Sequence, residues 1–280
     1  MSNTSSATAT VMRPRRPCVL VFAGSDPSGG AGLQADLQAI ATQGAHALTV
    51  TTALTVQNNN YVISINPVAA DLIFQQAQAL IDSIPIAAIK IGVIGTQANA
   101  QMIAQIITQL NAQAHAPLPV VLDTVLASGG GDALVASDPV ALMQTLYPLT
   151  TLLTPNLLEA RRLALPQAAT PLLDNTTVTD AAAHYFLQQG CAHVLLKGEH
   201  AGLPTITNRL YMADGQQHTW ISTRLSGEFH GTGCTLAAAI AAQLAQGQNM
   251  ENAVASALDY CHQTLQAAYA IAPGQAIPGR

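Results

Sequence analysis

The sequence CVLVFAGSDPSGGAGLQADLQ, residues 18–38, contains a buried strand, a glycine loop and the start of a helix. Residues 18–23 are apolar without alternation, which is typical of a strand that is covered on both faces. Glycines are concentrated in residues 24–32, and residues 33–43 follow with a helical pattern. This order of elements indicates the first unit of an α/β fold.

The same alternation continues along the chain. Further apolar strands are expected at residues 47–54, 87–91, 120–123, 152–154 and 193–197, and a hairpin at 209–212 and 218–223. Helices are expected at residues 67–84, 97–110, 139–146, 157–165, 179–189, 235–246 and 251–270. Apolar strands that are separated by helices predict a three-layer α/β/α fold around a mostly parallel sheet.

No repeat, long charged run or linker divides the chain, so a single domain is expected over residues 18–272, with residues 273–280 as a tail. Residues 1–17 are rich in Ser and Thr and carry three arginines, which is also typical of a transit peptide or a twin-Arg signal. Because the apolar segment that follows is shorter than a secretory h-region, we interpret residues 1–17 as a disordered tail.

The composition excludes several classes of function. Only 9% of the 280 residues are charged, against about 25% in ordinary soluble domains, so the Lys and Arg clusters that bind nucleic acid or anionic membranes are missing. Hydrophobic residues make up 49% of the chain, but no run approaches the roughly 20 apolar residues of a membrane-spanning helix. The four cysteines are widely spaced without a C-x-x-C pair, which favours reduced thiols in a cytoplasmic protein.

Polar residues gather at the expected strand ends, where parallel sheets bind their ligands. The only two lysines, Lys90 and Lys197, lie at or near two of these ends, and Asp123 and Asn156 lie at two others. This convergence indicates an anionic ligand. The sequence has no Walker P-loop, dinucleotide fingerprint, zincin motif or nucleophile elbow, which disfavours ordinary NTPases, Rossmann dehydrogenases, zincins and α/β-hydrolases.

The motif His230-Gly231-Thr232-Gly233-Cys234-Thr235 precedes an Ala-rich helix. Successive backbone N–H groups of such a loop, at the positive end of a helix, form an anion hole suited to a transferring phosphoryl group. The same field is expected to favour the thiolate of Cys234. Taken alone, the motif is equally typical of an ordinary glycine turn before a core helix, with Cys234 as a small buried side chain.

Two further polar residues indicate the kind of ligand. Asp36 follows the glycine loop of residues 26–32, where a ligand can approach the backbone closely. Gln57 ends an apolar run, and its amide presents a donor and an acceptor, which complements the edge of an aminopyrimidine. In isolation, Asp36 would equally be a solvated helix residue and Gln57 a surface glutamine.

Residues 23–37, AGSDPSGGAGLQADL, resemble the opening motif of hydroxymethylpyrimidine/phosphomethylpyrimidine kinases, which are thiamine-biosynthesis enzymes with a ribokinase-like fold. Six further segments resemble that family in the same order, at residues 52–58, 90–92, 120–125, 154–160, 194–198 and 230–235. The resemblance extends over residues 18–272. It implies an ATP-dependent kinase that phosphorylates 4-amino-5-hydroxymethyl-2-methylpyrimidine and then its monophosphate, with Mg²⁺ as cofactor and a homodimer as the assembly.

The resemblance also implies roles for individual residues. Cys234 would accept the hydroxyl proton of the substrate, and Lys197 would neutralise phosphate oxygens. The anion hole would consist of Gly231, Thr232 and Gly233. The pyrimidine pocket would be lined by Gly24, Asp36, Gln57, Val93, Val125 and Cys234. Asp123 and Glu159 would place Mg²⁺ with the ATP phosphates, and Asn156 and Lys197 would lie on the nucleotide side.

Three departures from the family's pattern bear on this expectation. Glu228-Phe229 replace an Asn-Thr pair, Glu199 replaces a glycine, and Val93 is smaller than the common methionine. A changed pocket shape leaves a pyridoxal or pyridoxine kinase open as the alternative. The two acids and the phenylalanine near the expected phosphates also leave open a non-catalytic sensor that binds the pyrimidine.

Overall fold

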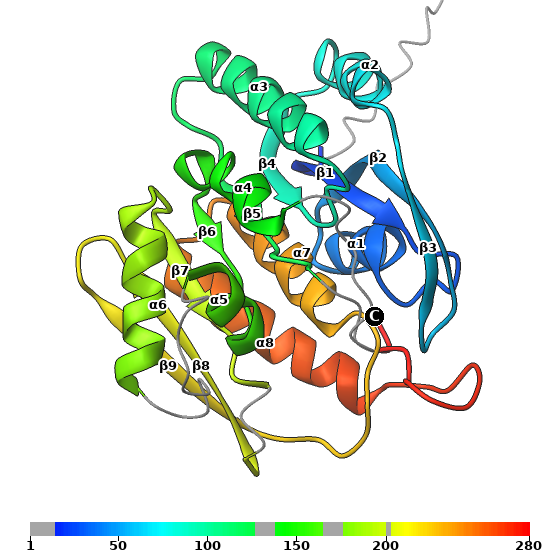
Figure 1. The fold of residues 1–280 in the computed structure, drawn as a ribbon, viewed down its shortest axis with the longest axis vertical. Coiled ribbons are helices and arrows are strands. Elements are labelled where there is room, and N and C mark those ends of the chain that lie inside the picture. Colours follow the sequence, from blue (N-terminus) through cyan, green and yellow to red (C-terminus); the bar gives the residue numbers. More distant parts are fainter. Residues whose placement is uncertain (1–14, 127–137, 165–175, 200–202) are drawn as a thin grey trace, which may run out of the picture.

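The computed structural model describes residues 15–126, 138–164, 176–199 and 203–280. The expected tail of residues 1–17 and the expected helix of residues 157–165 lie partly outside these ranges. The described strands are β1 (Cys18–Ser25), β2 (His46–Gln57), β3 (Val62–Pro67), β4 (Ile86–Ile91), β5 (Val120–Leu122), β6 (Leu152–Leu153), β7 (His193–Leu196), β8 (Thr205–Met212) and β9 (Gln217–Thr223). They form one sheet in the order β3-β2-β1-β4-β5-β6-β7-β8-β9 (Figure 1). The strands from β2 to β7 in this order run parallel. At one edge β3 pairs antiparallel with β2, and at the other edge β8 pairs antiparallel with β7 and β9 with β8.

Helices cover both faces of the sheet. They are α1 (Gly32–Thr42), α2 (Ala70–Ile81), α3 (Gln97–Gln113), α4 (Pro139–Gln144), the 3₁₀ helix η1 (Tyr147–Leu149), α5 (Leu157–Ala164), α6 (Thr176–Gln188), α7 (Thr232–Ala245) and α8 (Met250–Gln266). Buried residues of α1, α7 and α8 pack on one face, and those of α2 to α6 pack on the other (Figure 1). The expected three-layer α/β/α fold with a mostly parallel sheet is therefore confirmed.

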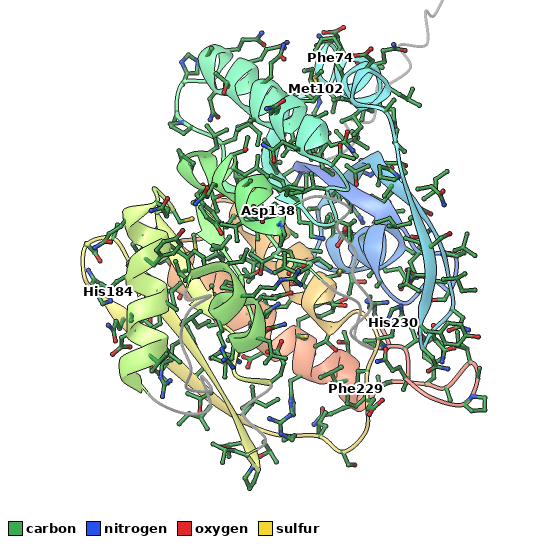
Figure 2. All side chains as sticks on the ribbon, viewed as in Figure 1. Phe74, Met102, Asp138, His184, Phe229 and His230 are labelled. Atoms are coloured by element: carbon green, nitrogen blue, oxygen red, sulfur yellow. The ribbon has the colours of Figure 1, made fainter. Side chains whose placement is uncertain are left out.

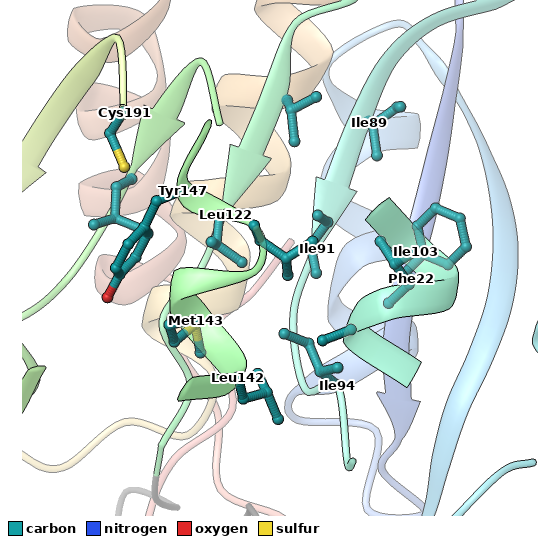
Figure 3. Packing of buried hydrophobic residues seen from close by; sticks show 14 of the residues in the cluster. Phe22, Ile89, Ile91, Ile94, Ile103, Leu122, Leu142, Met143, Tyr147 and Cys191 are labelled. Atoms are coloured by element: carbon teal, nitrogen blue, oxygen red, sulfur yellow. The ribbon is translucent and has the colours of Figure 1, made fainter. Parts of the chain in front are cut away.

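Strand β1 shows why the apolar runs lack alternation. Successive side chains of a strand point to opposite faces of its sheet. Val19 and Val21 pack with α1 and α7, whereas Leu20 and Phe22 pack with α3. Figure 3 shows Phe22 beside Ile103 of α3, in the cluster of buried residues on the face that α3 covers. A strand covered by helices on both sides needs apolar residues at every position.

Helix α7 is the central helix of its layer and is built largely from alanine. Residues 237–242 are completely buried, because small side chains allow the helix to pack closely on the sheet between α1 and α8. Although α7 is apolar, no helix in the described ranges combines the length and the hydropathy that a membrane span requires.

The structure differs from the expected elements mainly at β3 and at the C-terminus. Strand β3 is mostly exposed and carries polar residues, so it lacks the apolar run that marks the central strands, and α2 begins after it at Ala70. Helix α8 ends at Gln266. Beyond it, part of the expected tail of residues 273–280 packs on the domain, with Gln275 and Ile277 buried.

Candidate active site

A cavity of about 1000 Å³ lies where the carboxyl ends of β1, β2, β4, β5 and β7 converge. Except for Asp36, the residues predicted from the sequence all line it: Gly24, Gln57, Val93, Asp123, Val125, Asn156, Glu159, Lys197, Gly231, Thr232, Gly233 and Cys234. Residues that are far apart in the chain therefore meet at one edge of the sheet, as expected for the ligand site of a parallel sheet.

Asp26 organises the first glycine loop and joins it to the second. Its Oδ1 accepts hydrogen bonds from the backbone N–H and the hydroxyl of Ser28, both 2.8 Å, and its Oδ2 accepts from the Ala31 N–H at 2.8 Å. The same Oδ2 lies 2.8 Å from Nε2 of His230, which Figure 2 places in the segment before α7. Burial opposes ionisation of this carboxyl, but the bonds from His230 and Ser28 outweigh it and lower the pKa of Asp26 to about 2. Asp26 is therefore a carboxylate, and Nε2–H of His230 is the donor.

The second glycine loop touches the first one directly. Gly231 caps α7 with φ of +81°, and a Cβ there would overlap the carbonyl oxygen of Gly30. Only glycine fits this position, both for its left-handed backbone and for the close approach. The carbonyl of Gly231 accepts from the N–H and the hydroxyl of Thr235, at 3.0 and 2.8 Å. The first turn of α7 thereby faces the cavity.

Cys234 lies in that first turn as a buried thiol. Burial raises its pKa to about 12, although the nearby ammonium of Lys90 acts in the opposite direction. The prediction that Cys234 is a thiolate is therefore wrong for the site without substrate. Desolvation raises the pKa of the thiol by more than the Lys90 ammonium and the N-terminus of α7 lower it.

Lys90 and Asp36 form an ion pair that is completely buried, with Nζ 2.9 Å from Oδ1. The alternation of β4 places Lys90 on the same face as Ala88, toward α1, which carries Asp36. Burial raises the pKa of Asp36 to about 6 despite this partner, and Asp36 overcomes the effect of burial to raise the pKa of Lys90. Lys90 itself lines the cavity, while Asp36 is absent from the described lining. Asp36, expected in the pyrimidine pocket, instead binds the lysine.

The other residues predicted for the pyrimidine pocket lie together. A Cβ on Gly24 would be 3.5 Å from Cβ of Val93, so the glycine keeps this part of the cavity wide. Val93 packs in a small apolar cluster with Ala53 and Val125. Gln57, at the end of β2, lines the cavity with its amide partly exposed. An apolar slot with one amide is a suitable surface for a flat polar ring.

Lys197 is a cation beside the anion hole. Its Nζ lies 3.5 Å from Oδ1 of Asp123, and a Cβ on Gly233 would be 3.1 Å from the same Nζ. Burial disfavours the charged form, but Asp123 and Glu199 outweigh it and raise the pKa of Lys197. A charged ammonium therefore lies beside the N-terminus of α7.

Asn156 and Glu159 cap α5 reciprocally. Oδ1 of Asn156 accepts from the N–H of Glu159 at 2.9 Å, and Oε2 of Glu159 accepts from the N–H of Asn156 at 2.9 Å. The spacing Asn-x-x-Glu is the sequence signature of a capping box, a signal that the sequence analysis missed. Glu159 also accepts from the hydroxyl of Thr124, and burial raises its pKa to about 7.

The carboxylates of Asp123 and Glu159 suit a magnesium ion. Oδ2 of Asp123 is buried and has no hydrogen-bond partner within the described ranges. In the same ranges, no group of three or more His, Cys, Asp and Glu side chains is arranged to hold a metal. Mg²⁺ is commonly bound by one or two carboxylates together with substrate phosphates, so this donor set fits the ion that accompanies a nucleotide.

The sequence analysis missed two arginines of the cavity, Arg162 and Arg224. Both belong to the ten cations of the chain, so the scarcity of charge that singled out the lysines could have found them. Glu199, Glu228 and Phe229 also line the cavity. The three positions that depart from the family's pattern near the expected phosphates therefore face the site.

Comparisons with known proteins agree with this geometry. The family model described as phosphomethylpyrimidine kinase matches residues 26–278. A hydroxymethylpyrimidine/phosphomethylpyrimidine kinase of Streptomyces coelicolor is 34% identical over 261 residues, which cover 92% of this chain and 92% of that protein. The thiamine biosynthesis multifunctional protein ThiED of Corynebacterium efficiens is 32% identical over 94% of this chain, which spans 34% of that longer protein.

Solved structures show the same fold. A phosphomethylpyrimidine kinase from Clostridium difficile is similar with a TM-score of 0.74 and 28% identity, covering 89% of this chain and 100% of that one. The pyridoxal kinase from Staphylococcus aureus in complex with AMP-PCP and pyridoxal has a TM-score of 0.81 and 25% identity, covering 94% of this chain and 93% of that one. The expected ribokinase-like fold and the expected resemblance are both confirmed.

Asp26→Asn is expected to lower the free energy of unfolding at neutral pH by about 2 kcal/mol, because a pKa of about 2 against an ordinary 3.8 corresponds to about 1.4 kcal/mol per unit. Folding favours the ionised carboxylate, so this contribution is complete above about pH 4 and is lost as the pH falls toward 2. Urea unfolding at neutral pH and at about pH 3 measures the difference between the two proteins. Asp259→Asn, at an exposed position of α8, is the matched control. A difference that does not shrink in acid would contradict the assignment to ionised Asp26.

Proposed function

The chain belongs to the phosphomethylpyrimidine kinase family, and on this premise we propose that it transfers the γ-phosphoryl group of ATP to 4-amino-5-hydroxymethyl-2-methylpyrimidine. A second transfer, to the resulting monophosphate, gives the pyrophosphate that thiamine biosynthesis requires. The observation that carries the proposal is the continuity of one cavity, which joins an apolar slot with an amide to the N-terminus of α7 and the ammonium of Lys197. Acceptor and phosphoryl group can therefore meet in one cavity.

The acceptor binds in the slot between Gly24, Val93 and Val125. The absence of a side chain at Gly24 gives the ring room, and the two valines contact its faces. Gln57 pairs its amide with the amino group and the neighbouring ring nitrogen of the pyrimidine. This orientation directs the hydroxymethyl group toward Cys234.

The first turn of α7 stabilises the transferred group. Phosphoryl transfer passes through a loose transition state with negative charge on the equatorial oxygens. Backbone N–H groups from Gly231 to Cys234 donate to these oxygens, and Lys197 adds a positive charge beside Gly233. Because the loop is held by Asp26 and His230, these donors need little reorganisation during the reaction.

Asp123 and Glu159 would hold Mg²⁺ together with the phosphates of ATP. The ion would neutralise phosphate charge and orient the γ-phosphoryl group. Asp123 supplies the buried oxygen without a partner, and Glu159 is kept in place by Thr124 and the N–H of Asn156. Asn156 and Lys197 lie on the nucleotide side of the cavity.

Cys234 accepts the hydroxyl proton of the substrate only as the thiolate, because a thiol has no site for a further proton. Its resting form is the thiol, so it first releases its own proton to solvent, and the thiolate then takes the hydroxyl proton as the oxygen–phosphorus bond forms. The ammonium of Lys90 is the cation that favours the thiolate.

The products of the reaction test the proposed function. With MgATP and the hydroxymethylpyrimidine, mass spectrometry is expected to detect the monophosphate first and the diphosphate later. Competition with pyridoxal in one vessel, compared as kcat/KM, is expected to favour the pyrimidine. Preference for pyridoxal would support the alternative suggested by the pyridoxal kinase fold and by the small Val93. ATP consumption that depends on added pyrimidine would exclude the sensor, whereas binding of the pyrimidine without any ATP consumption would support it.

Cys234→Ala is expected to lower kcat by about 10²-fold, the lower end of the range for a positioned base, because a loose transition state gains little from proton removal. The matched control is Cys261→Ala, which removes another buried thiol of the same cavity and should keep kcat close to the wild-type value. Steady-state kinetics gives kcat of both variants, and circular dichroism verifies that they are folded. Wild-type turnover in Cys234→Ala would exclude this residue from proton transfer.

A homodimer in the cytoplasm is the proposed state of the protein. All four cysteines are free thiols, as in a reducing compartment. On the β2–β3 ribbon, Thr55 and Gln57 face the cavity, while four large apolar side chains are about half or more exposed: Leu54, Val56, Tyr61 and Ile63. Such a concentrated apolar surface is typical of a contact between copies.

Ile63→Asp is expected to convert the dimer into a monomer, because it places a charge in the apolar surface of the ribbon. Ile221→Asp, on β9, is the matched control, since Ile221 is 68% exposed and Ile63 is 69% exposed. Light scattering after gel filtration gives the molar mass of each protein. A wild-type monomer, or loss of the dimer in the control alone, would contradict the assignment of this surface.

A further inference from the structure

The last residues of the chain return to the segment that precedes α7. The N–H of His230 donates to the carbonyl of Ala276, and the N–H of Ala276 donates to the carbonyl of Glu228, both at 2.9 Å. Figure 1 marks the C-terminal end of the chain close to the beginnings of α1 and α7. This segment therefore lies directly against the loop that carries the anion hole.

The same segment is also tied to the β2–β3 turn. Nδ2 of Asn59 donates to the carbonyl of Gln275 at 3.0 Å, and the N–H of Gln275 donates to Oδ1 of Asn60 at 3.0 Å. Because Asn60 and Gln275 both line the cavity, the C-terminal residues connect its acceptor side with the anion hole.

Arg280 bonds to oxygens of both glycine loops. Its Nη2 donates to the carbonyl of Gly30 at 2.6 Å and lies 3.5 Å from the carbonyl of Gly231. Its Nε donates at 2.7 Å to the hydroxyl of Thr235, which in turn donates to the carbonyl of Gly231. A planar guanidinium with several fixed donors can hold these oxygens simultaneously, whereas an ammonium is a compact point charge.

These bonds orient the backbone at the start of α7. The carbonyl of Gly231 and the N–H of Thr232 belong to one planar peptide unit and point in opposite directions. Since the carbonyl is directed toward Thr235 and Arg280, the N–H is directed away from them. Thr232 lines the cavity, and Arg280 is absent from its described lining. The arginine therefore contacts the loop on the side that faces away from the cavity.

The guanidinium of Arg280 forms no salt bridge in the described part of the chain, and its buried Nη1 makes no hydrogen bond to the described residues. It lies beside the N-terminus of α7, where its charge adds to the positive potential of the helix end.

We propose that Arg280 is a positioning residue for phosphoryl transfer, which holds the carbonyls of Gly30 and Gly231 so that the N–H groups of α7 face the transferred phosphoryl group. The inference rests on the proposed function, because it is that function which places the phosphoryl group at this loop. It requires the geometry of the guanidinium and not only its charge.

The test compares Arg280→Lys and Arg280→Ala with the wild-type chain in the pyrimidine kinase assay. Both variants are expected to lose about 10-fold to 10²-fold in kcat, because the oxyanion donors lose their orientation. KM for the pyrimidine is expected to stay within about threefold, since the side-chain hydrogen bonds of Arg280 to the described residues go to Gly30, Gly231 and Thr235 and not to the acceptor slot. Added guanidinium ion, at concentrations far below denaturing ones, is expected to restore part of kcat in Arg280→Ala only. Arg209→Ala, at another half-buried arginine, is the matched control.

Several results would overturn the proposal. One is wild-type kcat in Arg280→Lys, which would show that charge alone suffices, and another is a loss confined to KM. A loss of kcat that follows a fall in Tm and is not rescued by guanidinium would leave Arg280 a merely structural residue. Calorimetry with inorganic phosphate separates this inference from the proposed function. Even if neither pyrimidine nor pyridoxal is phosphorylated, Arg280→Ala should bind phosphate more weakly than the wild type, and equal affinity contradicts the role of Arg280.

Discussion

The hydrogen bond between Asp26 and His230 joins two glycine loops that are separated by 204 residues in the chain, and the geometry of the cavity depends on this contact. It is a bond between a carboxylate and an imidazole in a buried place, where polar groups are costly unless they are paired. Because the loops touch at Gly30 and Gly231, the N-termini of α1 and α7 both face the cavity. Two positive helix ends are thereby directed at the same ligand, which is an arrangement that suits phosphate.

The buried charges of this charge-poor chain have two different uses. Lys90 has no exposed surface and is paired closely with Asp36, so it links β4 to α1 at the wall of the cavity. Lys197 has a longer contact of 3.5 Å with Asp123 and lines the cavity, where it can also bind an anion. Charge is costly to bury and is tolerated where a partner or a ligand compensates it. The scarcity of charge therefore concentrates the remaining cations and acids around one cavity.

Patterns in the sequence predicted those parts of the fold that have a local cause. Apolar runs such as residues 18–23 predicted the central strands, because helices cover both of their faces. Strand β3 was not predicted, because an exposed strand at the edge of a sheet needs no apolar run. The capping box of Asn156 and Glu159 also has a local cause, because the spacing of the two residues is enough to predict it.

The α/β class, the two glycine loops and the family can all be predicted from the sequence, because they depend on local periodicity and on motifs in a specific order. Three features follow from tertiary packing instead: Asp36 is paired with Lys90, burial favours the thiol of Cys234, and Arg280 reaches the anion hole. Each of these depends on which distant segments pack together and on how much water they exclude. Burial and contact between remote residues control pKa values and hydrogen bonds, and neither is encoded in the spacing of neighbouring residues.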